Sequence, residues 1–211
     1  TGQSLSNTAN FSFTSNPARN QQYQKIADFY DDRIGRDEFF MGMNLLRRSL
    51  LYWHCTGTVL EVGAGTGRNL TYYTPLFQSA TVDRVVLMDQ SDQMLAQAKQ
   101  KIAALGDNET AFQQKLKFAC VEGDATHTKL PDNSFDTVVD TFGLCSYNDP
   151  VAVLQEMARV CKPTGKILLL EHGRSAQWTW VTQHLDQHAE THAQNWGCVW
   201  NRDMDDLLRQ S

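Results

Sequence analysis

The amino-acid sequence predicts an α/β fold of the doubly wound type, in which helices cover both faces of a mainly parallel sheet. From Gly57 onward, short apolar runs alternate with helical patterns, as in repeated strand–helix units with right-handed crossovers. Runs such as TVVD and ILLL offer apolar side chains to both faces of the sheet, which is typical of parallel strands. A glycine-rich loop also joins the first run directly to the first of these helices.

The expected strands are short apolar runs, and turn-forming residues separate them from the helices. Strands are expected at residues 58–62, 85–89, 116–121, 135–140 and 166–171. Helices are expected at residues 68–77, 91–105 and 150–161. Turns are expected at residues 83–84, 106–108, 131–133 and 162–165. Together these segments define a core over residues 57–171.

Two other kinds of sequence flank this core. Residues 1–16 are rich in Ser, Thr and Asn and lack periodicity, so we expect a flexible arm there. Residues 17–56 carry apolar residues at helical spacing, which predicts two leading helices. Residues 172–211 also have helical patterns, and no strand pattern follows them. The sequence therefore predicts one domain over residues 17–211.

Composition and charge exclude several classes of protein. The chain has 211 residues, of which 41% are hydrophobic and 20% are charged, as in an ordinary globular domain rather than a disordered one. Its net charge of −5 gives no basic surface for nucleic acid. Five scattered cysteines without a CxxC pair argue against a disulfide framework or a structural zinc site. They fit a reducing compartment, so we do not expect secretion.

The glycine-rich loop is the most informative part of the sequence. Gly63, Gly65 and Gly67 follow an apolar run and precede a helix, where glycine permits a tight turn and the close approach of a ligand. The dinucleotide fingerprint GxGxxG would need Gly or Ala at position 68, which is Arg68. A P-loop pattern is also absent. The loop therefore indicates a different kind of ligand.

Four motifs in order resemble those of class I S-adenosylmethionine-dependent methyltransferases. They are the loop E-V-G-x-G-x-G from Glu61, the stretch from Asp89 through Met94, the Gly-Asp-Ala of residues 123–125, and the strand pattern of residues 135–140. The resemblance implies a Rossmann-like sheet in the order 3-2-1-4-5. That family normally closes with a sixth and a seventh strand, which this sequence lacks. Because the chain also begins at Thr1, we expect it to be trimmed at the N-terminus and shortened at the C-terminus.

The resemblance also implies which residues bind S-adenosylmethionine. Gly63, Gly65, Thr66 and Gly67 would hold the methionyl part, Asp89 the ribose hydroxyls, and Asp124 with Ala125 the adenine. The other residues expected at the cofactor site are Tyr30, Glu61, Ala64, Asn69, Gln90, Met94, Asp140 and Thr141. Tyr30 belongs to a Y-x-x-I-A-x-x-Y-D pattern that resembles ubiquinone/menaquinone-biosynthesis methyltransferases, but it would equally serve to pack a helix on the sheet.

This narrower resemblance implies methyl transfer to a small hydrophobic acceptor such as a quinone precursor. Residues 140–150, 170–174 and 196–201 are similar to mitochondrial methyltransferase-like proteins, which implies the matrix side of mitochondria, with the cytoplasm as the alternative. A thiol or another small acceptor remains open. So does a cofactor-binding protein with a structural or assembly role and no turnover.

His172 is the candidate catalytic base, because it follows the fifth strand and imidazole titrates near neutral pH. The alternative is a histidine bonded to a backbone carbonyl. Asp140 is a second candidate, although orienting the cofactor or capping the next loop suits it better. Cys145 lies near the expected methyl site, and we interpret it as a buried thiol.

Two features near the C-terminus carry weaker predictions. His184, His188 and His192 lie on one helical face, but without a clear fourth ligand we expect no metal there. Tryptophans cluster in the same region, which suits a peripheral membrane or protein-complex contact, although packing on the sheet is the simpler interpretation. These tryptophans are Trp178, Trp180, Trp196 and Trp200.

Overall fold

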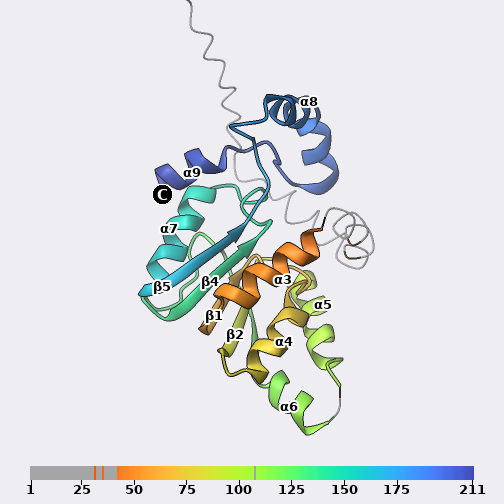
Figure 1. Ribbon diagram of the computed structural model, residues 1–211, viewed down its shortest axis with the longest axis vertical. Helices are drawn as coiled ribbons and strands as arrows, with labels where there is room; N and C mark the ends of the chain where they lie inside the picture. The colour runs from red at the N-terminus through yellow and green to blue at the C-terminus, as the bar shows by residue number, and fades with distance from the viewer. Residues whose placement is uncertain (1–30, 32–34, 36–41, 107) are drawn as a thin grey trace, which may run out of the picture.

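The computed structural model describes residues 31, 35, 42–106 and 108–211. Its centre is a five-stranded sheet in the order β3-β2-β1-β4-β5, with every pair of neighbouring strands parallel (Figure 1). The predicted doubly wound fold and strand order are therefore confirmed. Among the described residues, no strand follows β5.

The strands lie close to their predicted positions. Their bounds are β1 Gly57–Val62, β2 Val82–Asp89, β3 Phe118–Glu122, β4 Phe135–Thr141 and β5 Cys161–Leu170. In the middle of the sheet, Leu60 of β1 pairs with Val86 of β2 on one side and with Val138 of β4 on the other. Since the strands are parallel, all of their carboxyl ends meet at one edge of the sheet, where ligands bind in open α/β folds.

Helices cover both faces of the sheet. They are α3 Met43–His54, α4 Leu70–Gln78, α5 Asp92–Ala103, α6 Glu109–Lys115, α7 Pro150–Val160, α8 Thr179–Trp196 and α9 Met204–Gln210. Neighbouring residues of one strand enter opposite cores, because side chains alternate along a strand. Val59 packs with α3, α4 and α5 on one face, whereas Leu60 packs with α7 on the other. This explains why the strands are apolar at consecutive positions.

Three local predictions are wrong. Residues 83–84 do not form a turn, because they lie within β2, where the pairing with β1 passes from Gly57↔Val82 to Thr58↔Arg84 and skips one residue as a bulge. The third strand begins at Phe118 rather than at residue 116, because α6, which the sequence analysis missed, precedes it and leaves Leu116 64% exposed. Residues 162–165 do not form a separate turn before the fifth strand. They lie within β5, where the pairing with β4 jumps from Phe135↔Cys161 to Thr137↔Lys166, so the extra residues are accommodated as a bulge.

The C-terminal region lies beyond the carboxyl ends of β4 and β5 (Figure 1). No residue of α8 is buried, and contacts on either side of this helix hold it. Arg174 pairs with Asp186 at 2.7 Å, and the indole N–H of Trp200 donates to the backbone oxygen of Leu185 at 2.9 Å. In the part of the chain that the structure describes, no helix is long and apolar enough to cross a membrane.

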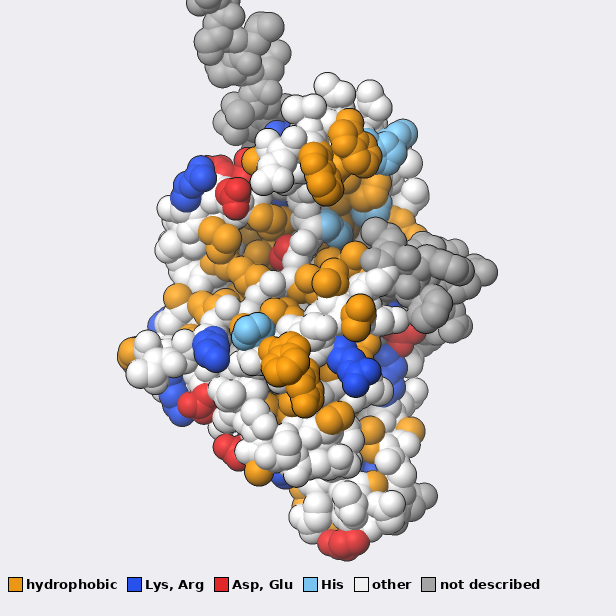
Figure 2. All heavy atoms as spheres, viewed as in Figure 1, with side chains coloured by type: hydrophobic (Ala, Val, Ile, Leu, Met, Phe, Trp, Pro, Cys, Tyr) orange, Lys and Arg blue, Asp and Glu red, His pale blue; other side chains and the backbone are white. Residues whose placement is uncertain are grey.

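The four late tryptophans have different environments. The Trp200 ring stacks on His192 with the ring centroids 3.9 Å apart, and Trp196 is partly buried, so packing explains these two. Trp178 and Trp180 are instead 61% and 68% exposed. Figure 2 shows hydrophobic side chains both over α3 and at the end of the molecule formed by α8. A membrane or protein contact through these side chains stays a prediction.

Candidate active site

The glycine loop turns sharply at the carboxyl end of β1. Gly63, Gly65 and Gly67 have φ values of 61°, 54° and 75°, which residues other than glycine rarely adopt. A Cβ at Gly63 would overlap the hydroxyl of Tyr147, and one at Gly67 would lie 2.6 Å from a methyl of Leu70. At Gly65 the nearest atom would be 4.0 Å away, so the loop is open there.

Asp89, at the end of β2, lies against this open part of the loop. Its Oδ2 accepts a hydrogen bond from the backbone N–H of Gly65, and its Oδ1 from that of Ser91, both at 2.8 Å. Burial raises the pKa of Asp89, whereas these two N–H groups lower it. Of its predicted neighbours, Gln90 is exposed, and Met94 is buried in α5 with its N–H capped by Ser91 Oγ at 3.3 Å.

The end of β3 lies beside Asp89. The N–H of Gly123 donates to the backbone oxygen of Asp89 at 3.0 Å. This bond brings the segment that contains Asp124 close to Asp89. Oδ1 of Asp124 accepts from the backbone N–H and the hydroxyl of Thr126, at 2.9 and 2.8 Å, while the side chain remains exposed. Ala125 is buried. Residues from β1, β2 and β3 are thus brought together as predicted.

A network of buried polar side chains lies beneath the glycine loop, on its protein side. Glu61 accepts from Asn69 Nδ2 at 3.1 Å and from the hydroxyl of Tyr73 at 2.7 Å. Asn69 also donates to Oγ1 of Thr141 at 3.1 Å. Burial raises the pKa of Glu61 to about 7, although the hydrogen bond from Tyr73 and the charge of Arg47 oppose the shift. We therefore interpret Glu61, Asn69 and Thr141 as residues that position the loop.

Arg47 of α3, which no sequence pattern predicted at the site, completes this network. Its Nη1 donates to Oγ1 of Thr141 at 2.5 Å and to Oδ1 of Asn69 at 3.2 Å, and its guanidinium lies over the Phe142 ring. Arg47 is buried, whereas the neighbouring Arg48 is exposed. The two arginines are neighbours in the sequence, and only the way in which α3 packs on the rest of the protein distinguishes them.

Asp31 connects the N-terminal part of the chain to the loop. Its Oδ1 accepts from the hydroxyl of Thr66 at 2.7 Å and pairs with Arg68 at 3.0 Å, and its Oδ2 pairs with Lys101. Tyr30, the predicted cofactor residue next to it, lies outside the described residues. Ala64 is buried in the loop, and its N–H donates to the backbone oxygen of Met88 at 2.9 Å.

Two acids meet where β4 and β5 end. Oδ1 of Asp140 and Oε1 of Glu171 each accept from the backbone N–H of Gly143 at 2.9 Å, and Glu171 also accepts from that of Leu144 at 3.1 Å. Burial and the nearby Glu171 raise the pKa of Asp140 well above its ordinary value. Asp140 is fully buried, so the structure places it as a cap of the loop after β4. Glu171 was not predicted.

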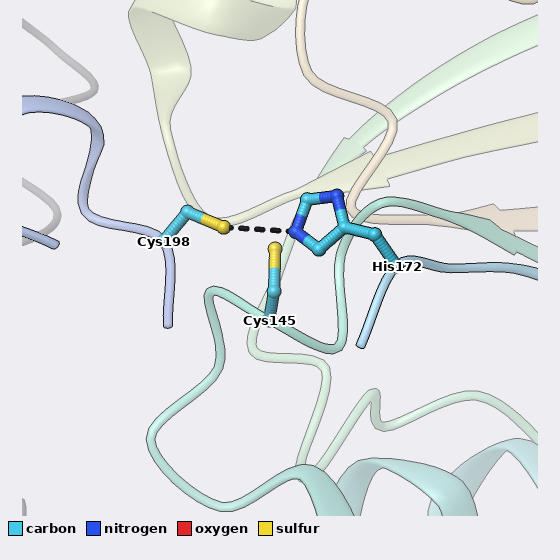
Figure 3. Close-up of side chains that lie close together, drawn as sticks. All are labelled: Cys145, His172 and Cys198. Carbon is cyan, nitrogen blue, oxygen red and sulfur yellow. Dashed lines mark hydrogen bonds between the residues drawn. The ribbon is translucent and has the colours of Figure 1, made fainter. Parts of the chain in front are cut away.

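His172 lies next to two thiols (Figure 3). Its Nε2 is 3.1 Å from Sγ of Cys198, and its ring centroid is 5.5 Å from that of Phe142. Cys145 is buried, as predicted, and its hydrogen bond with Cys198, together with burial, raises the pKa of its thiol well above the ordinary value. Cys198 was not predicted at this position, because it is far from the other two residues along the chain.

An open parallel sheet in the order 3-2-1-4-5, with a glycine loop after β1 and an acid at the end of β2, defines a methyltransferase of class I architecture. The chain belongs to the methyltransferase domain family, whose family model matches residues 60–169. The predicted family is confirmed.

Two relatives and one solved structure illustrate the similarity. The chain is 35% identical over 213 residues to the mitochondrial methyltransferase OMS1 of Saccharomyces cerevisiae, across 92% of this chain and 42% of the relative. It is 32% identical over 157 residues to a ubiquinone/menaquinone biosynthesis C-methyltransferase, UbiE, of an Enterobacter species, across 72% and 58%. The chain thus spans about half the length of these relatives.

The solved structure is a SAM-dependent methyltransferase, a possible histamine N-methyltransferase, of Thermotoga maritima. It superposes with a TM-score of 0.64 at 16% identity and covers 91% of this chain and 78% of the other. At this identity the similarity supports the fold.

Proposed function

We propose that this chain transfers a methyl group from S-adenosylmethionine to a small hydrophobic acceptor such as a quinone precursor. The observation that carries the proposal is the contact between Asp89 and the open glycine loop, where Oδ2 accepts from the N–H of Gly65 at 2.8 Å. This contact holds a carboxylate at the carboxyl edge of the sheet, beside a glycine whose backbone a ligand can approach closely.

The residues at this edge fit S-adenosylmethionine. Gly65 leaves open space for the methionyl part, because even a Cβ there would have no neighbour closer than 4.0 Å. Each oxygen of Asp89 has a lone pair beyond its bond to backbone N–H, so the carboxylate can also accept from two ribose hydroxyls. Asp124 and Ala125 follow β3 directly after Gly123, whose N–H donates to the backbone oxygen of Asp89, and we assign the adenine to them.

When bound, S-adenosylmethionine supplies a methyl group on a positively charged sulfur. The chain's own part is to align the acceptor with that methyl and to exclude water. Asp140 holds the loop after β4 through the N–H of Gly143, and so fixes one wall of the site. His172, half-buried after β5, is our candidate to take the acceptor's proton.

The nature of the acceptor rests on the names of relatives. The Enterobacter relative is a ubiquinone/menaquinone biosynthesis C-methyltransferase, and a demethylmenaquinone methyltransferase of Shouchella clausii is 36% identical over 116 residues. Both names specify a quinone product or precursor, which supports a small hydrophobic acceptor. The name of the yeast relative supports a mitochondrial location. The second candidate, a binding protein without turnover, would share the same cofactor contacts.

Cofactor binding is tested by isothermal titration with S-adenosylmethionine and S-adenosylhomocysteine. We expect Asp89→Asn to weaken binding by about 10- to 100-fold, the loss typical of hydrogen bonds to a charged group. Asp92→Asn is the matched control, because Asp92 is exposed in the first turn of α5. If neither ligand binds the wild type, or if Asp89→Asn binds both as tightly as the wild type does, the proposal is wrong.

Methyl transfer is tested separately with methyl-labelled S-adenosylmethionine. The purified chain is incubated with demethylated quinone precursors and, in parallel, with small thiols. Label in the quinone, lost in Asp89→Asn and retained in Asp92→Asn, supports the proposal. Label in the thiol alone would mean that the acceptor is a thiol and not a quinone precursor. Cofactor binding without any methyl transfer would favour a structural role.

A further inference from the structure

We propose that Cys145, His172 and Cys198 form a binding site for a zinc ion. One ligand atom from each of these residues lies within 4.8 Å of the other two. Figure 3 shows both sulfur atoms directed toward the same edge of the imidazole ring. The site shares His172, the candidate base, with the proposed function, but zinc binding itself does not depend on methyl transfer or on the contact between Asp89 and the glycine loop.

The spacing of the three atoms suits one tetrahedral ion. Zinc binds thiolate sulfur at about 2.3 Å and imidazole nitrogen at about 2.0–2.1 Å, so two ligands of one ion are about 3.5–3.8 Å apart. The His172 Nε2 and Cys198 Sγ are 3.1 Å apart, and every pair of ligand atoms is within 4.8 Å. Side-chain rotations that move the ligand atoms by about 1 Å are therefore enough to coordinate the ion.

The chemistry of the cluster also favours zinc over a hard cation. Two thiols and an imidazole are soft or borderline ligands, and Mg²⁺ or Ca²⁺ would require oxygen atoms instead. Cys145 and Cys198 are only 2% and 6% exposed, so their sulfur atoms are shielded from solvent. Binding forms two zinc–sulfur bonds and one zinc–nitrogen bond, and it releases the two thiol protons to water. The fourth tetrahedral position remains for water or another small ligand.

The three ligands come from different parts of the fold. Cys145 lies in the loop after β4, His172 in the segment after β5, and Cys198 after α8. The N–H of Val199 already donates to the backbone oxygen of Cys145 at 2.9 Å, which holds the third segment in place. A zinc ion would therefore fasten the C-terminal region to the carboxyl edge of the sheet. It would also occupy the imidazole nitrogen, so zinc binding and proton transfer by His172 exclude each other.

The histidine stripe of α8 is a weaker metal site. The rings of His184 and His188 have centroids 4.8 Å apart, but His192 stacks on Trp200. Among the described residues, Cys145, His172 and Cys198 are the ones that bring three possible metal ligands together. The stripe nevertheless supplies a control, since His188→Ala removes one exposed imidazole without touching the proposed site.

The test uses the full chain, purified anaerobically with a non-thiol reductant and stripped of metal by a chelator. Zinc is then titrated in competition with a chromophoric chelator, and cobalt is added in a parallel sample. We expect one zinc per chain and a thiolate-to-cobalt charge-transfer band. Cys145→Ser, Cys198→Ser and His172→Asn should each weaken zinc binding by more than about 100-fold, since losing even an outer partner of a ligand costs about 10- to 100-fold. Cys120→Ser and His188→Ala should bind zinc as the wild type does.

A second measurement needs no variant at the site. Both thiols are buried, so alkylation is followed in urea just below the unfolding midpoint, where the segments that carry them open often enough to react. Zinc should protect Cys145 and Cys198 of the wild-type chain there, relative to the metal-free chain at the same fraction folded, and peptide mass spectrometry reads each cysteine with Cys120 as the reference. Equal zinc affinity of the wild type and of Cys145→Ser/Cys198→Ser would overturn the proposal. So would a Cys145–Cys198 disulfide in the anaerobic protein, or alkylation of both thiols at an unchanged rate.

Discussion

Asp140 and Glu171 accept a hydrogen bond from the same backbone N–H, that of Gly143, at 2.9 Å in each case. The two carboxyl groups are therefore close neighbours in a buried place, where two negative charges repel each other strongly. Burial raises the pKa of Glu171 to about 8 and that of Asp140 well above its ordinary value. At neutral pH the pair holds protons that it would release on unfolding.

This pair makes stability depend on pH. Unfolded Glu has a pKa near 4.5 and folded Glu171 one of about 8, so between these values the folded state binds more protons. Its stabilising effect is complete below about pH 4.5 and is lost as pH rises toward 8. Each pKa unit corresponds to about 1.4 kcal/mol. We expect the free energy of unfolding, measured with urea, to fall between pH 5 and 8.

Glu171→Gln is expected to flatten this decline, since an amide does not titrate. Glu190→Gln is the control, because Glu190 lies on the exposed face of α8. An equal decline in the wild type and in Glu171→Gln would show that Glu171 does not take up the proton.

Gly63 and Gly65 are expected to respond differently to the same substitution. Both have positive φ, so alanine costs about 1–2 kcal/mol of backbone strain at either position. At Gly63 the new Cβ would also overlap the hydroxyl of Tyr147, whereas at Gly65 it would enter open space. Gly63→Ala should therefore destabilise the fold more. Gly65→Ala should mainly weaken binding of S-adenosylmethionine, because the methyl fills the space proposed for it.

Thermal unfolding and cofactor titration separate these two effects. Adding Tyr147→Phe to Gly63→Ala should restore part of the lost stability, because the atom that overlaps is the hydroxyl oxygen. No restoration would mean that backbone strain alone accounts for the cost. Equal loss of stability in both alanine variants would contradict the steric argument.

Arg47 should contribute far more to stability than Arg48. Arg47 is 4% exposed, so Arg47→Met removes the guanidinium that donates to Oδ1 of the buried Asn69 and leaves Oγ1 of Thr141 with Asn69 as its other donor. We expect a loss of about 3–5 kcal/mol, as when one partner of a buried charged network is removed. Arg48→Met, on the exposed side of the same helix, should change stability by less than about 0.5 kcal/mol. Urea unfolding of both variants checks the difference, and similar losses would contradict it.

Local patterns were enough to predict the five strands in chain order, the helices α4, α5 and α7, and the positions of the glycine loop and Asp89 at the ends of β1 and β2. The reason is that strand, loop and helix follow one another along the chain. Their apolar residues, glycines and strand-end acid therefore form a recognisable pattern in the sequence. The bulge of residues 162–165 was missed because Lys-Pro-Thr-Gly has the composition of a turn, while tertiary pairing with β4 kept it in the strand.

The missed site residues depend on contacts between distant segments. Arg47, Glu171 and Cys198 approach the site only after α3, β5 and the C-terminal region have packed. None of the three has a local pattern that distinguishes it from a surface arginine, a strand-end acid or a scattered cysteine. Their roles follow from burial and distance, which a single sequence does not contain.

Glu156 of α7 should give the opposite pH dependence to that of Glu171. Its Oε1 accepts from the backbone N–H and the hydroxyl of Thr128, at 2.7 and 2.6 Å, and from Arg159 at 2.7 Å. The hydrogen bond from Arg159 is the largest cause that lowers the pKa of Glu156 to about 2. The charged form is thus the stabilised one. This contribution is complete above the unfolded pKa near 4.5 and is lost as pH falls toward 2.

Glu156→Gln is expected to cost about 1.5–3 kcal/mol at pH 6, the range for hydrogen bonds to a charged group. The difference from the wild type should shrink between pH 4.5 and 2.5, since the wild-type carboxylate itself takes up a proton there. Glu190→Gln again serves as the exposed control and should stay within about 0.5 kcal/mol at every pH. A cost that is independent of pH would mean that shape, rather than charge, matters at this position. Together with the fall expected from Glu171, the combined contribution of these two glutamates should be greatest near pH 5, because Glu156 is charged there while the acid pair at the end of β4 and β5 remains protonated.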